Sequence, residues 1–344
     1  MTRVGVRQQS ETCIVRAHGG GGELMNKLIS EHIISAFGNT TLNQLTDGAV
    51  LPAETSRVVI TTDSYVVDPL QFPGGDIGRL AVCGTVNDLA VMGARPLGLS
   101  LGLIVEEGFE LARLDQILSS VAKAAHEADV RIVTGDTKVI EHSGGSGIFI
   151  NTSGVGSLDD RINIGLDRVE VGDAILVNGT IGDHGMAVMS VRSGLEFDTD
   201  IRSDAAPLNG LIHELIDAGV DIHFMRDATR GGLAAVLVDI CEQSGLGVEV
   251  DESELPRDPI VRAAAEVLGF DLLTVANEGK VVAVVPQDQA DMCLGLMTRH
   301  TRGRDGAIIG RIVACDLPLV ELVTESGGRR VVQRPYGEEL PRIC

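Results

Sequence analysis

Apolar residues recur along the chain at two spacings, which predict alternating helices and strands. From Leu111 to Ala125 they recur about every 3.6 positions, the period of a helix with one buried face, and this helix should end near Glu127. Residues 58–62 form a short, β-branched run typical of a buried strand. The same reasoning predicts helices at 23–37, 75–92, 184–193, 205–218, 231–244 and 258–268, and strands at 96–105, 131–133, 147–155, 174–177, 280–285, 307–312 and 319–323. The mixture predicts an α+β (α/β) fold.

Length and local composition divide the chain into four parts. A chain of 344 residues exceeds the size at which one core usually stops growing, so two domains are expected. The stretch 158–172 is rich in Asp and Gly and is typical of a linker. We predict a flexible N-terminal segment with a glycine-rich loop and a helix at 1–38, a first domain at 39–157, an α/β domain at 158–330 and a C-terminal tail at 331–344.

Charge and cysteine usage narrow the classes of partner. The formal net charge is -21, which repels nucleic acid and anionic membranes, so neither is an expected partner. Six cysteines are present without a C-x-x-C pair, and we expect most of them to be buried thiols. The N-terminus has no apolar signal region, and no apolar run is long enough to span a bilayer. A reducing cytoplasm is the predicted location.

The tail at 335–344, P-Y-G-E-E-L-P-R-I-C, ends on the thiol of Cys344. Its prolines and glycine disfavour a helix and favour an extended path. Ten extended residues span at most roughly 33 to 36 Å, enough to carry a thiol from a domain edge into a cleft. The alternative is a frayed terminus that ends in cysteine by chance. The choice depends on whether the body contains a site that uses a delivered thiol.

Five aspartates stand in glycine- or threonine-rich contexts at predicted strand ends or junctions. They are Asp47, Asp63, Asp88, Asp136 and Asp227. Such carboxylates can converge as oxygen ligands for Mg2+ that holds a nucleotide phosphate. For any one of them, an Asx-turn or a helix cap is the alternative interpretation. Five together favour the metal-nucleotide hypothesis.

Two of the four lysines lie in candidate site loops, Lys138 in T-G-D-T-K and Lys280 in N-E-G-K. A lysine can position a phosphate or, if burial lowers its pKa, transfer a proton, and Glu278 is a candidate general base. Exposed charges at strand ends are the alternative for each. His184 and His223 are interpreted as loop or core histidines.

Residues His18, Gly19, Gly20, Gly21 and Gly22 form a glycine run that can approach anionic oxygens through its backbone N–H groups. A glycine run alone is a weak signal. The chain has no G-x-x-x-x-G-K-[ST] motif, which excludes a P-loop, and no H-E-x-x-H helix.

Taken together, these motifs resemble one known family. The matching stretches are H-G-G-G-G at 18–22, T-T-D-S-Y-V-V-D-P-L-Q-F-P-G-G-D-I-G at 61–78, C-G-T-V-N-D-L-A-V-M-G-A at 83–94, G-D-T-K-V at 135–139, R-D-A-T-R-G-G-L at 226–233, N-E-G-K at 277–280 and the terminal P-R-I-C. Residues 12–344 resemble the hydrogenase maturation factor HypE family, carbamoyl dehydratases related to aminoimidazole ribotide synthetase, selenophosphate synthetase and thiamine-monophosphate kinase. The terminal P-R-I-C distinguishes HypE proteins from these relatives.

The resemblance implies a two-domain PurM-like fold whose first domain binds ATP and forms a dimer sheet or barrel, near which the ATP site lies. It also implies ATP-dependent dehydration of a carbamoyl group on Cys344, from S-carboxamide to thiocyanate, which supplies cyanide to the iron of [NiFe]-hydrogenase. The implied partners are a carbamoyltransferase that loads Cys344, an iron-carrying HypC–HypD scaffold complex and a second copy of the chain.

The resemblance also assigns roles to residues. Mg2+ and ATP are placed at Asp47, Asp63, Asp88, Asp136 and Asp227, with Asn87 and the glycine run 18–22 also at ATP. Lys138 and Glu278 are assigned to proton removal, and the resemblance does not decide which of them carries out which proton transfer. Because T-D-G-A-V at 46–50 lacks the second acid common in the wider superfamily, the metal role of Asp47 is the least secure.

Two other functions remain open on the sequence. One is a different ATP-dependent phosphoryl-transfer enzyme of the same superfamily that acts on a small molecule and does not need Cys344. The other is a non-catalytic acidic scaffold that binds maturation partners through its tail.

Overall fold

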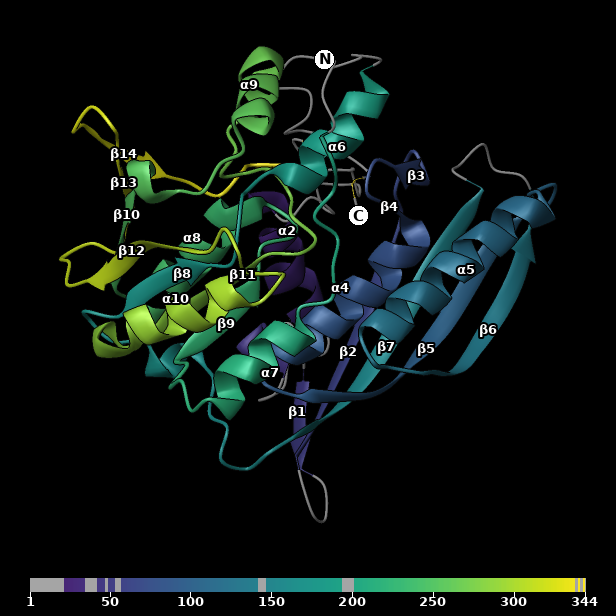
Figure 1. Cartoon of the computed structure of the whole chain (residues 1–344), viewed down its shortest axis with the longest axis horizontal. Coiled ribbons are helices and arrows are strands. Elements are labelled where there is room, and N and C mark those ends of the chain that lie inside the picture. The colour runs from purple at the N-terminus through teal and green to yellow at the C-terminus, as the bar shows by residue number, and fades with distance from the viewer. Residues whose placement is uncertain are drawn as a thin grey trace.

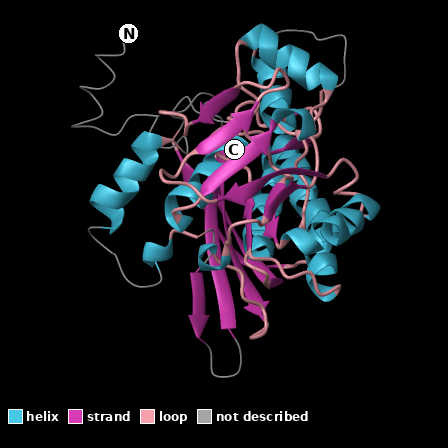
Figure 2. Ribbon diagram, turned by 90° about the vertical axis from the view of Figure 1, so that its left-hand side faces the viewer, coloured by secondary structure: helices cyan, strands magenta, loops and turns pink. Residues whose placement is uncertain are grey.

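The chain folds into two large sheets with helices packed against them, and one small two-stranded sheet (Figure 1). The structure is a computed structural model, and it describes residues 22–34, 42–46, 49–52, 57–141, 147–193, 201–337, 340 and 343. Within this part, no helix is long and apolar enough to cross a membrane. The helices, strands and loops of the two domains are distinguished in Figure 2.

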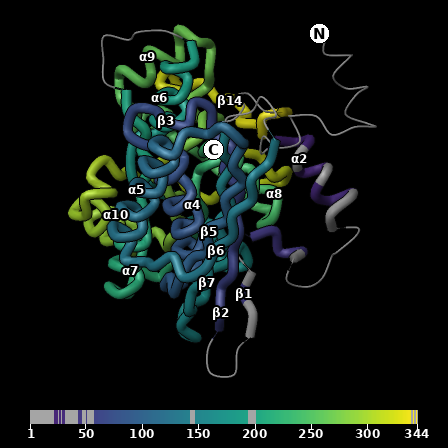
Figure 3. The backbone as a smooth tube through the Cα atoms, turned by 90° about the vertical axis from the view of Figure 1, so that its right-hand side faces the viewer, coloured from purple at the N-terminus to yellow at the C-terminus, as the bar shows by residue number. Residues whose placement is uncertain are grey.

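The first domain is a five-stranded sheet in the order β1-β2-β7-β5-β6. Only the β5–β6 pair is parallel. Two helices, α4 and α5, cover one face of the sheet (Figure 3). The elements are β1 (Ala49–Pro52), β2 (Arg57–Tyr65), α4 (Ile77–Val91), β5 (Arg95–Glu106), α5 (Leu111–Glu127), β6 (Ile132–Ile140) and β7 (Ile148–Leu158), with a small hairpin of β3 (Gln71–Phe72) and β4 (Gly75–Asp76) before α4.

The other face of this sheet is open and carries apolar side chains. Along β2, Val59 and Tyr65 are buried whereas Ile60 is 41% exposed, because successive side chains of a strand point to opposite faces. Val155, the register partner of Ile60 on β7, and Ile104 on β5 are 38% and 43% exposed. The open face therefore combines these apolar side chains with the hydrogen-bonded polar groups of Thr62, Ser64, Asn151 and Ser153.

The second domain is a seven-stranded sheet in the order β14-β13-β10-β12-β8-β11-β9, with helices on both faces. Its strands are β8 (Ala174–Val177), β9 (Phe224–Asp227), β10 (Gly247–Asp251), β11 (Val281–Val285), β12 (Ala307–Val313), β13 (Val320–Val323) and β14 (Arg329–Val332). Its α-helices are α6 (Asp183–Arg192), α7 (Asn209–Asp217), α8 (Gly232–Ser244), α9 (Pro259–Leu268) and α10 (Ala290–Arg299). Short turns of 3-10 helix are η4 (Leu166–Arg168), η5 (Glu252–Glu254) and η6 (Gln287–Gln289).

Strand β11 explains how one sheet supports two cores. All five of its residues are buried; Val282 and Val284 join one core with α8, while Val281, Ala283 and Val285 join another with α7 and α10. A continuous apolar run is what a strand covered on both faces requires. Ala90 and Val91 from the end of α4 belong to the second of these cores, which ties the two domains together.

Most predicted elements are confirmed, although several boundaries differ by three or more residues. The predicted helix at 23–37 is α-helical only as α2 (Glu23–Leu28) and continues as a π-helix, η2 (Ile29–Ile34). The predicted strand at 131–133 is the start of β6, which runs to Ile140. Residues 133–140 of this edge strand are exposed, so its sequence has no apolar alternation to reveal it. The prediction missed the strands β1, β3, β4, β9, β10 and β14, helix α10, and the short turns η3 (Leu42–Gln44), η4, η5 and η6.

Candidate functional site

The N-E-G-K segment before β11 is shaped by the carboxylate of Asp204. Asp204 Oδ1 accepts a hydrogen bond from the backbone N–H of Glu278 at 3.0 Å. Its Oδ2 accepts hydrogen bonds from the backbone N–H of Gly279 at 3.1 Å and from Lys280 Nζ at 2.8 Å. The lysine of this motif is therefore buried in an ion pair, and the glutamate is free to face the junction between the domains.

Glu278 is buried, and its Oε1 atom has no hydrogen-bond partner among the described residues. Burial raises the pKa of this carboxyl well above its usual value, and the nearby charges of Asp227, Asp204 and Asp63 raise it further, whereas Arg230 lowers it. A carboxyl of this kind is a strong base once it loses its proton. The prediction that Glu278 is a general base stays a prediction, and its environment fits that role.

Asn87, in α4, holds Glu278 from the other domain. Its Nδ2 atom donates to the carbonyl oxygens of Ala206 at 3.1 Å and Glu278 at 3.4 Å, and its Oδ1 accepts from the Leu208 N–H at 2.7 Å. The buried amide is thus satisfied by backbone groups. Its contacts position the glutamate, and the prediction that it binds ATP stays untested.

Two strands and a helix bring acidic groups toward the same junction. Asp63 lies within β2, with Oδ1 3.4 Å from Arg230 Nη2. Asp88, in the last turn of α4, accepts a hydrogen bond from Thr61 Oγ1 at 2.7 Å. Asp227 ends β9 and is buried. Asp63 and Asp88 thus lie inside regular elements, not at the strand ends or junctions that the sequence indicated.

Tyr65 is a buried site residue that the sequence analysis missed. Burial raises its pKa well above the usual value, as do the charges of Asp63, Asp88 and Glu278. A Cβ atom at Gly84 would lie 2.2 Å from the tyrosine hydroxyl oxygen, so the ring needs a glycine on the facing helix. Alternation along β2 places Tyr65 on the same face as Asp63, and that signal would have identified it.

Asp136 and Lys138 lie away from this group. Both side chains are 70% exposed, and Lys138 Nζ is 3.2 Å from Asp136 Oδ2. They belong to β6, three strand spacings from β2 in the sheet order, which is about 14 Å. Lys138 pairs in register with outward-facing Ile104, so both side chains project from the open face. The prediction that this segment is a loop is wrong, because it continues an edge strand.

Part of the predicted site lies outside the described residues: His18, Gly19, Gly20, Gly21, Asp47 and Cys344. Gly22 is described and is buried against the start of the tail. The backbone N–H groups of Glu23 and Leu24 donate to the carbonyl oxygens of Pro335 and Tyr336 at 3.1 and 3.4 Å. The end of the glycine run therefore meets the beginning of the tail.

The described end of the tail lies in the same region as Glu278. Ile343 is buried in a core that includes Tyr65 and Ala276, two residues before the glutamate. The Ile343 carbonyl oxygen is 2.8 Å from His184 Nε2. His184 is buried, as the interpretation of a core histidine predicts, and its Nε2 atom also contacts the tail.

The described acids fit a metal ion only in part. No three Asp, Glu, His or Cys side chains of the described part are grouped so that they could hold a metal ion by themselves. Asp63, Asp88 and Asp227 nevertheless lie around the junction, and carboxylate oxygens suit Mg2+, which often takes one or two of them with phosphate and water. These three are the residues of the described part that would hold Mg2+ beside a nucleotide.

A second, mostly buried acid, Asp183, accompanies the Lys280 ion pair. Its Oδ2 is 3.6 Å from Lys280 Nζ and also accepts a hydrogen bond from Thr180. Burial raises the pKa of Asp183 to about 6, although Lys280 opposes the shift. The charge of Lys280 is therefore shared between the carboxylates of Asp183 and Asp204.

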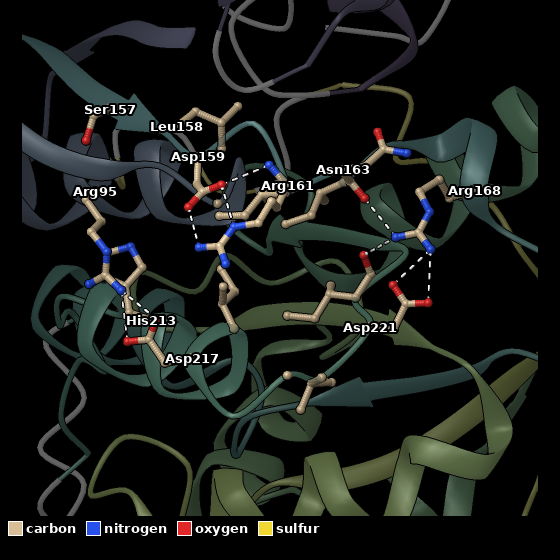
Figure 4. Close-up of a pocket in the computed structure, with 17 residues that line it drawn as sticks. Arg95, Ser157, Leu158, Asp159, Arg161, Asn163, Arg168, His213, Asp217 and Asp221 are labelled. Atoms are coloured by element: carbon tan, nitrogen blue, oxygen red, sulfur yellow. Dashed lines mark hydrogen bonds and ion pairs between the residues drawn. The ribbon is translucent and has the colours of Figure 1, made fainter. Parts of the chain in front are cut away.

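A pocket with a volume of about 1000 Å³ lies elsewhere, where the linker meets α7 (Figure 4). Its arginines pair with aspartates on its walls: Arg95 with Asp217, Arg161 with Asp159, and Arg168 with Asp221. Leu158 of its lining stands six residues along β7 from Thr152, the register partner of Asp63, a separation of about 20 Å. This pocket is separate from the candidate site.

Comparison with known proteins supports this architecture. The model of the AIR synthase related protein N-terminal domain matches residues 45–158, and that of the C-terminal domain matches residues 170–320. These matches, with the two sheets and the acidic junction, define a two-domain PurM-like protein of the AIR synthase related class.

The similarity to one group within this class is much higher. Carbamoyl dehydratase HypE of Bradyrhizobium diazoefficiens is 50% identical over 333 residues, 96% of each chain, and that of Azotobacter vinelandii is 47% identical over 344 residues, all of each chain. A crystal structure of a HypE–HypF complex has a TM-score of 0.85 at 49% identity over 90% of this chain and 99% of the other. A crystal structure of HypE in complex with ATP has a TM-score of 0.81 at 41% sequence identity, and the match covers 96% of this chain and 100% of the other. The chain belongs to the HypE family of carbamoyl dehydratases.

Proposed function

We propose that this enzyme dehydrates a carbamoyl group carried on Cys344, with ATP as co-substrate, and that the product thiocyanate supplies cyanide to the iron of [NiFe]-hydrogenase. The observation that carries the proposal is Glu278, a buried carboxyl with an unpartnered oxygen among the described residues and a raised pKa. The inward position of Ile343 supports it, because that residue precedes the acceptor cysteine.

The chemistry explains why such a base is needed. The S-carboxamide oxygen attacks the γ-phosphorus of ATP, and ADP leaves, which converts a poor leaving oxygen into a phosphate ester. The two N–H protons are then removed, the C–O bond breaks with loss of phosphate, and a C≡N bond remains on sulfur. Glu278 accepts a proton from nitrogen in this sequence, and Lys138 is the second candidate for proton transfer.

Mg2+ and ATP would be held at the acidic junction. Mg2+ would neutralise charge on the transferring phosphoryl group. Asp63, Asp88 and Asp227 are its proposed ligands in the described part, and Arg230, next to Asp63, would contact phosphate oxygens. Asp47 and the glycine run 18–22 complete the proposed site. A relative of this family has been solved in complex with ATP, which supports ATP as the co-substrate.

The positions of Asp136 and Lys138 support a homodimer. Both project from the open face of the first sheet, about 14 Å from Asp63 and on the opposite face. Within one chain Lys138 therefore does not meet Asp63 or Glu278, and a second copy that covers the open face would place Lys138 of both chains at their interface. We therefore infer that each site combines Glu278 of one chain with Lys138 of its partner.

The proposed partners follow the reaction. A carbamoyltransferase would load Cys344, as the HypE–HypF complex of a relative suggests, and an iron-carrying HypC–HypD complex would receive the cyanide. The proposed location of these steps is the cytoplasm, where the terminal thiol stays reduced.

Intact mass spectrometry tests the function. The protein is incubated with carbamoyl phosphate, Mg2+, ATP and a carbamoyltransferase of the HypF type, and the mass of the tail adduct is followed. The expected result is addition of one carbamoyl group and then loss of one water, with ATP hydrolysed in step. A carbamoyl adduct that persists in the presence of ATP would contradict the proposal.

Two cysteine variants control this experiment. Cys344→Ala should abolish both mass changes. Cys315→Ala removes an exposed thiol at another position and should leave both unchanged. Cys83, Cys241 and Cys293 are buried, as predicted for most of the thiols, and are poor acceptors for a large partner.

A further inference from the structure

The ring of His184 joins the start of helix α6 to the tail. Its Nδ1 atom is 2.8 Å from Ser203 Oγ, and its Nε2 atom is 2.8 Å from the carbonyl oxygen of Ile343. The edge of the ring packs against Phe72, with centroids 5.2 Å apart. The imidazole is fully buried, so three contacts from different parts of the chain fix its orientation.

These contacts determine which ring nitrogen carries the proton. A carbonyl oxygen only accepts, so Nε2 donates its N–H to Ile343. The backbone N–H of Ala205 already donates to Ser203 Oγ at 3.1 Å, and the serine hydroxyl then donates to the unprotonated Nδ1. Burial lowers the pKa of His184, which agrees with a neutral imidazole. His184 therefore donates a hydrogen bond from Nε2 to the Ile343 carbonyl oxygen of the tail.

The tail packs on the same turn of α6. Ile343 is buried in a core that includes Val188, one turn after His184. A Cβ atom at Gly185 would lie 3.2 Å from Leu340 Cδ1 and 2.5 Å from Val275 Cγ1, so a glycine at this position leaves room for the leucine. The apolar contacts of Leu340 and Ile343, together with the hydrogen bond to His184, hold the tail in one position. We call this group of contacts the seat.

We propose that His184 is a positioning residue that seats the tail for dehydration. This inference rests on the proposed function. The carbonyl that His184 binds belongs to the planar peptide group between Ile343 and the terminal cysteine, so holding it restricts the path of the acceptor. One hydrogen bond and two apolar side chains make a contact that can form and break repeatedly, as a carrier arm requires.

The test compares three variants of the full-length protein. His184→Leu removes the donor, and His184→Gln keeps an N–H donor on a side chain of similar length. His213→Leu is the matched control, because His213 is also buried with Nε2 on a carbonyl oxygen, that of Ala94, at 3.1 Å. It lines the separate large pocket. Each variant is loaded by the carbamoyltransferase, and single-turnover dehydration with ATP is timed by mass spectrometry.

His184→Leu should dehydrate the loaded group roughly 10- to 100-fold more slowly, the cost of leaving a buried carbonyl unpaired, while the rate of carbamoyl loading stays the same or rises. His184→Gln should recover most of the dehydration rate, and His213→Leu should match the wild type. Equal rates for His184→Leu and His213→Leu, or equal slowing of loading and dehydration in His184→Leu, would overturn the inference.

A second measurement does not depend on the dehydratase reaction. Alkylation of the tail cysteine by iodoacetamide, located by peptide mass spectrometry, should be several-fold faster in His184→Leu than in His213→Leu, because an unseated tail exposes its thiol. Equal alkylation rates would reject the seat. If the wild-type protein fails to dehydrate but this difference is found, the proposed function is wrong and the seat stands.

Discussion

The carboxylate of Asp204 lies 2.8 Å from Lys280 Nζ, and both side chains are buried beneath the loop that presents Glu278. The same carboxylate accepts the N–H groups of Glu278 and Gly279. Asp204 therefore neutralises the charge of buried Lys280 and fixes the backbone position of Glu278, the candidate base.

Breaking this pair should destabilise the fold strongly. Among the described residues, Asp204→Asn leaves Lys280 with Asp183 as its remaining ion-pair partner, and loss of one member of a buried ion pair costs about 3 kcal/mol. Urea unfolding measures the change. Asp217→Asn breaks the exposed pair with Arg95 and should cost less than about 1 kcal/mol. Similar losses in the two variants would contradict this assignment.

Asp183 should make stability depend on pH in the opposite sense to an ordinary ion-paired acid. Because its folded pKa is raised to about 6, the folded chain keeps a proton that the unfolded chain releases near pH 4, so rising pH destabilises the fold through this window. Asp183→Asn should be more stable than the wild type at pH 7.5, by up to about 3 kcal/mol. Melting curves at several pH values test this, and a stability difference that does not shrink toward pH 4 would refute it.

Glu278→Gln should stop dehydration and leave the fold intact. The glutamine is neutral, as the buried acid is when protonated, so stability should change little, whereas loss of a positioned base slows proton transfer by at least about 100-fold. Wild-type dehydration should accelerate as pH rises, because the raised pKa of Glu278 holds back the base form. Single-turnover rates report both effects, with exposed Glu254→Gln as the control. A Glu278→Gln rate within threefold, roughly, of the control would exclude the base role.

The shared site of the proposed dimer can be tested by mixing two inactive variants. If Glu278 and Lys138 of one site come from different chains, a mixed dimer of Glu278→Gln and Lys138→Ala contains one fully native site. Random mixing should then restore about one quarter of wild-type activity. Sites built within single chains would give no recovery.

Gly22 should be intolerant of any side chain. A Cβ atom there would lie 2.1 Å from the Pro335 carbonyl oxygen, so Gly22→Ala must displace the start of the tail, at a cost of about 1–3 kcal/mol. Limited proteolysis of the tail and thermal unfolding measure the effect. Gly295, within α10, has open space around its Cβ position, and Gly295→Ala should gain up to about 1 kcal/mol. Equal protease resistance of the two variants would argue against the Gly22 contact.

Local patterns were sufficient for part of the fold. The five apolar residues of β11 and the 3.6-residue period of α5 appear directly in the sequence, because burial on two faces or on one stripe requires them. The motifs around Asp63, Asp227 and Glu278 likewise predicted the family, which the comparisons confirm. Most of strand β6 was missed beyond its start because its residues after Ile132 are exposed, and pairing with β5 continues the strand.

The sequence by itself determined which residues are available for the chemistry, and the tertiary structure decided which of them meet. Asp204 stands 74 residues before Glu278, and His184 stands 159 residues before Ile343, so no local pattern links either pair. The raised pKa of Glu278 arises from burial between the two domains and from the charges of Asp227, Asp204 and Asp63, which come from distant segments of the chain. The G-D-T-K motif shows the opposite case. The sequence placed Asp136 and Lys138 at the same site as Asp63, whereas the structure places them on the open face of the first sheet, away from Asp63. Hydrophobic periodicity is a local property, whereas proximity, burial and charge coupling depend on how distant segments pack.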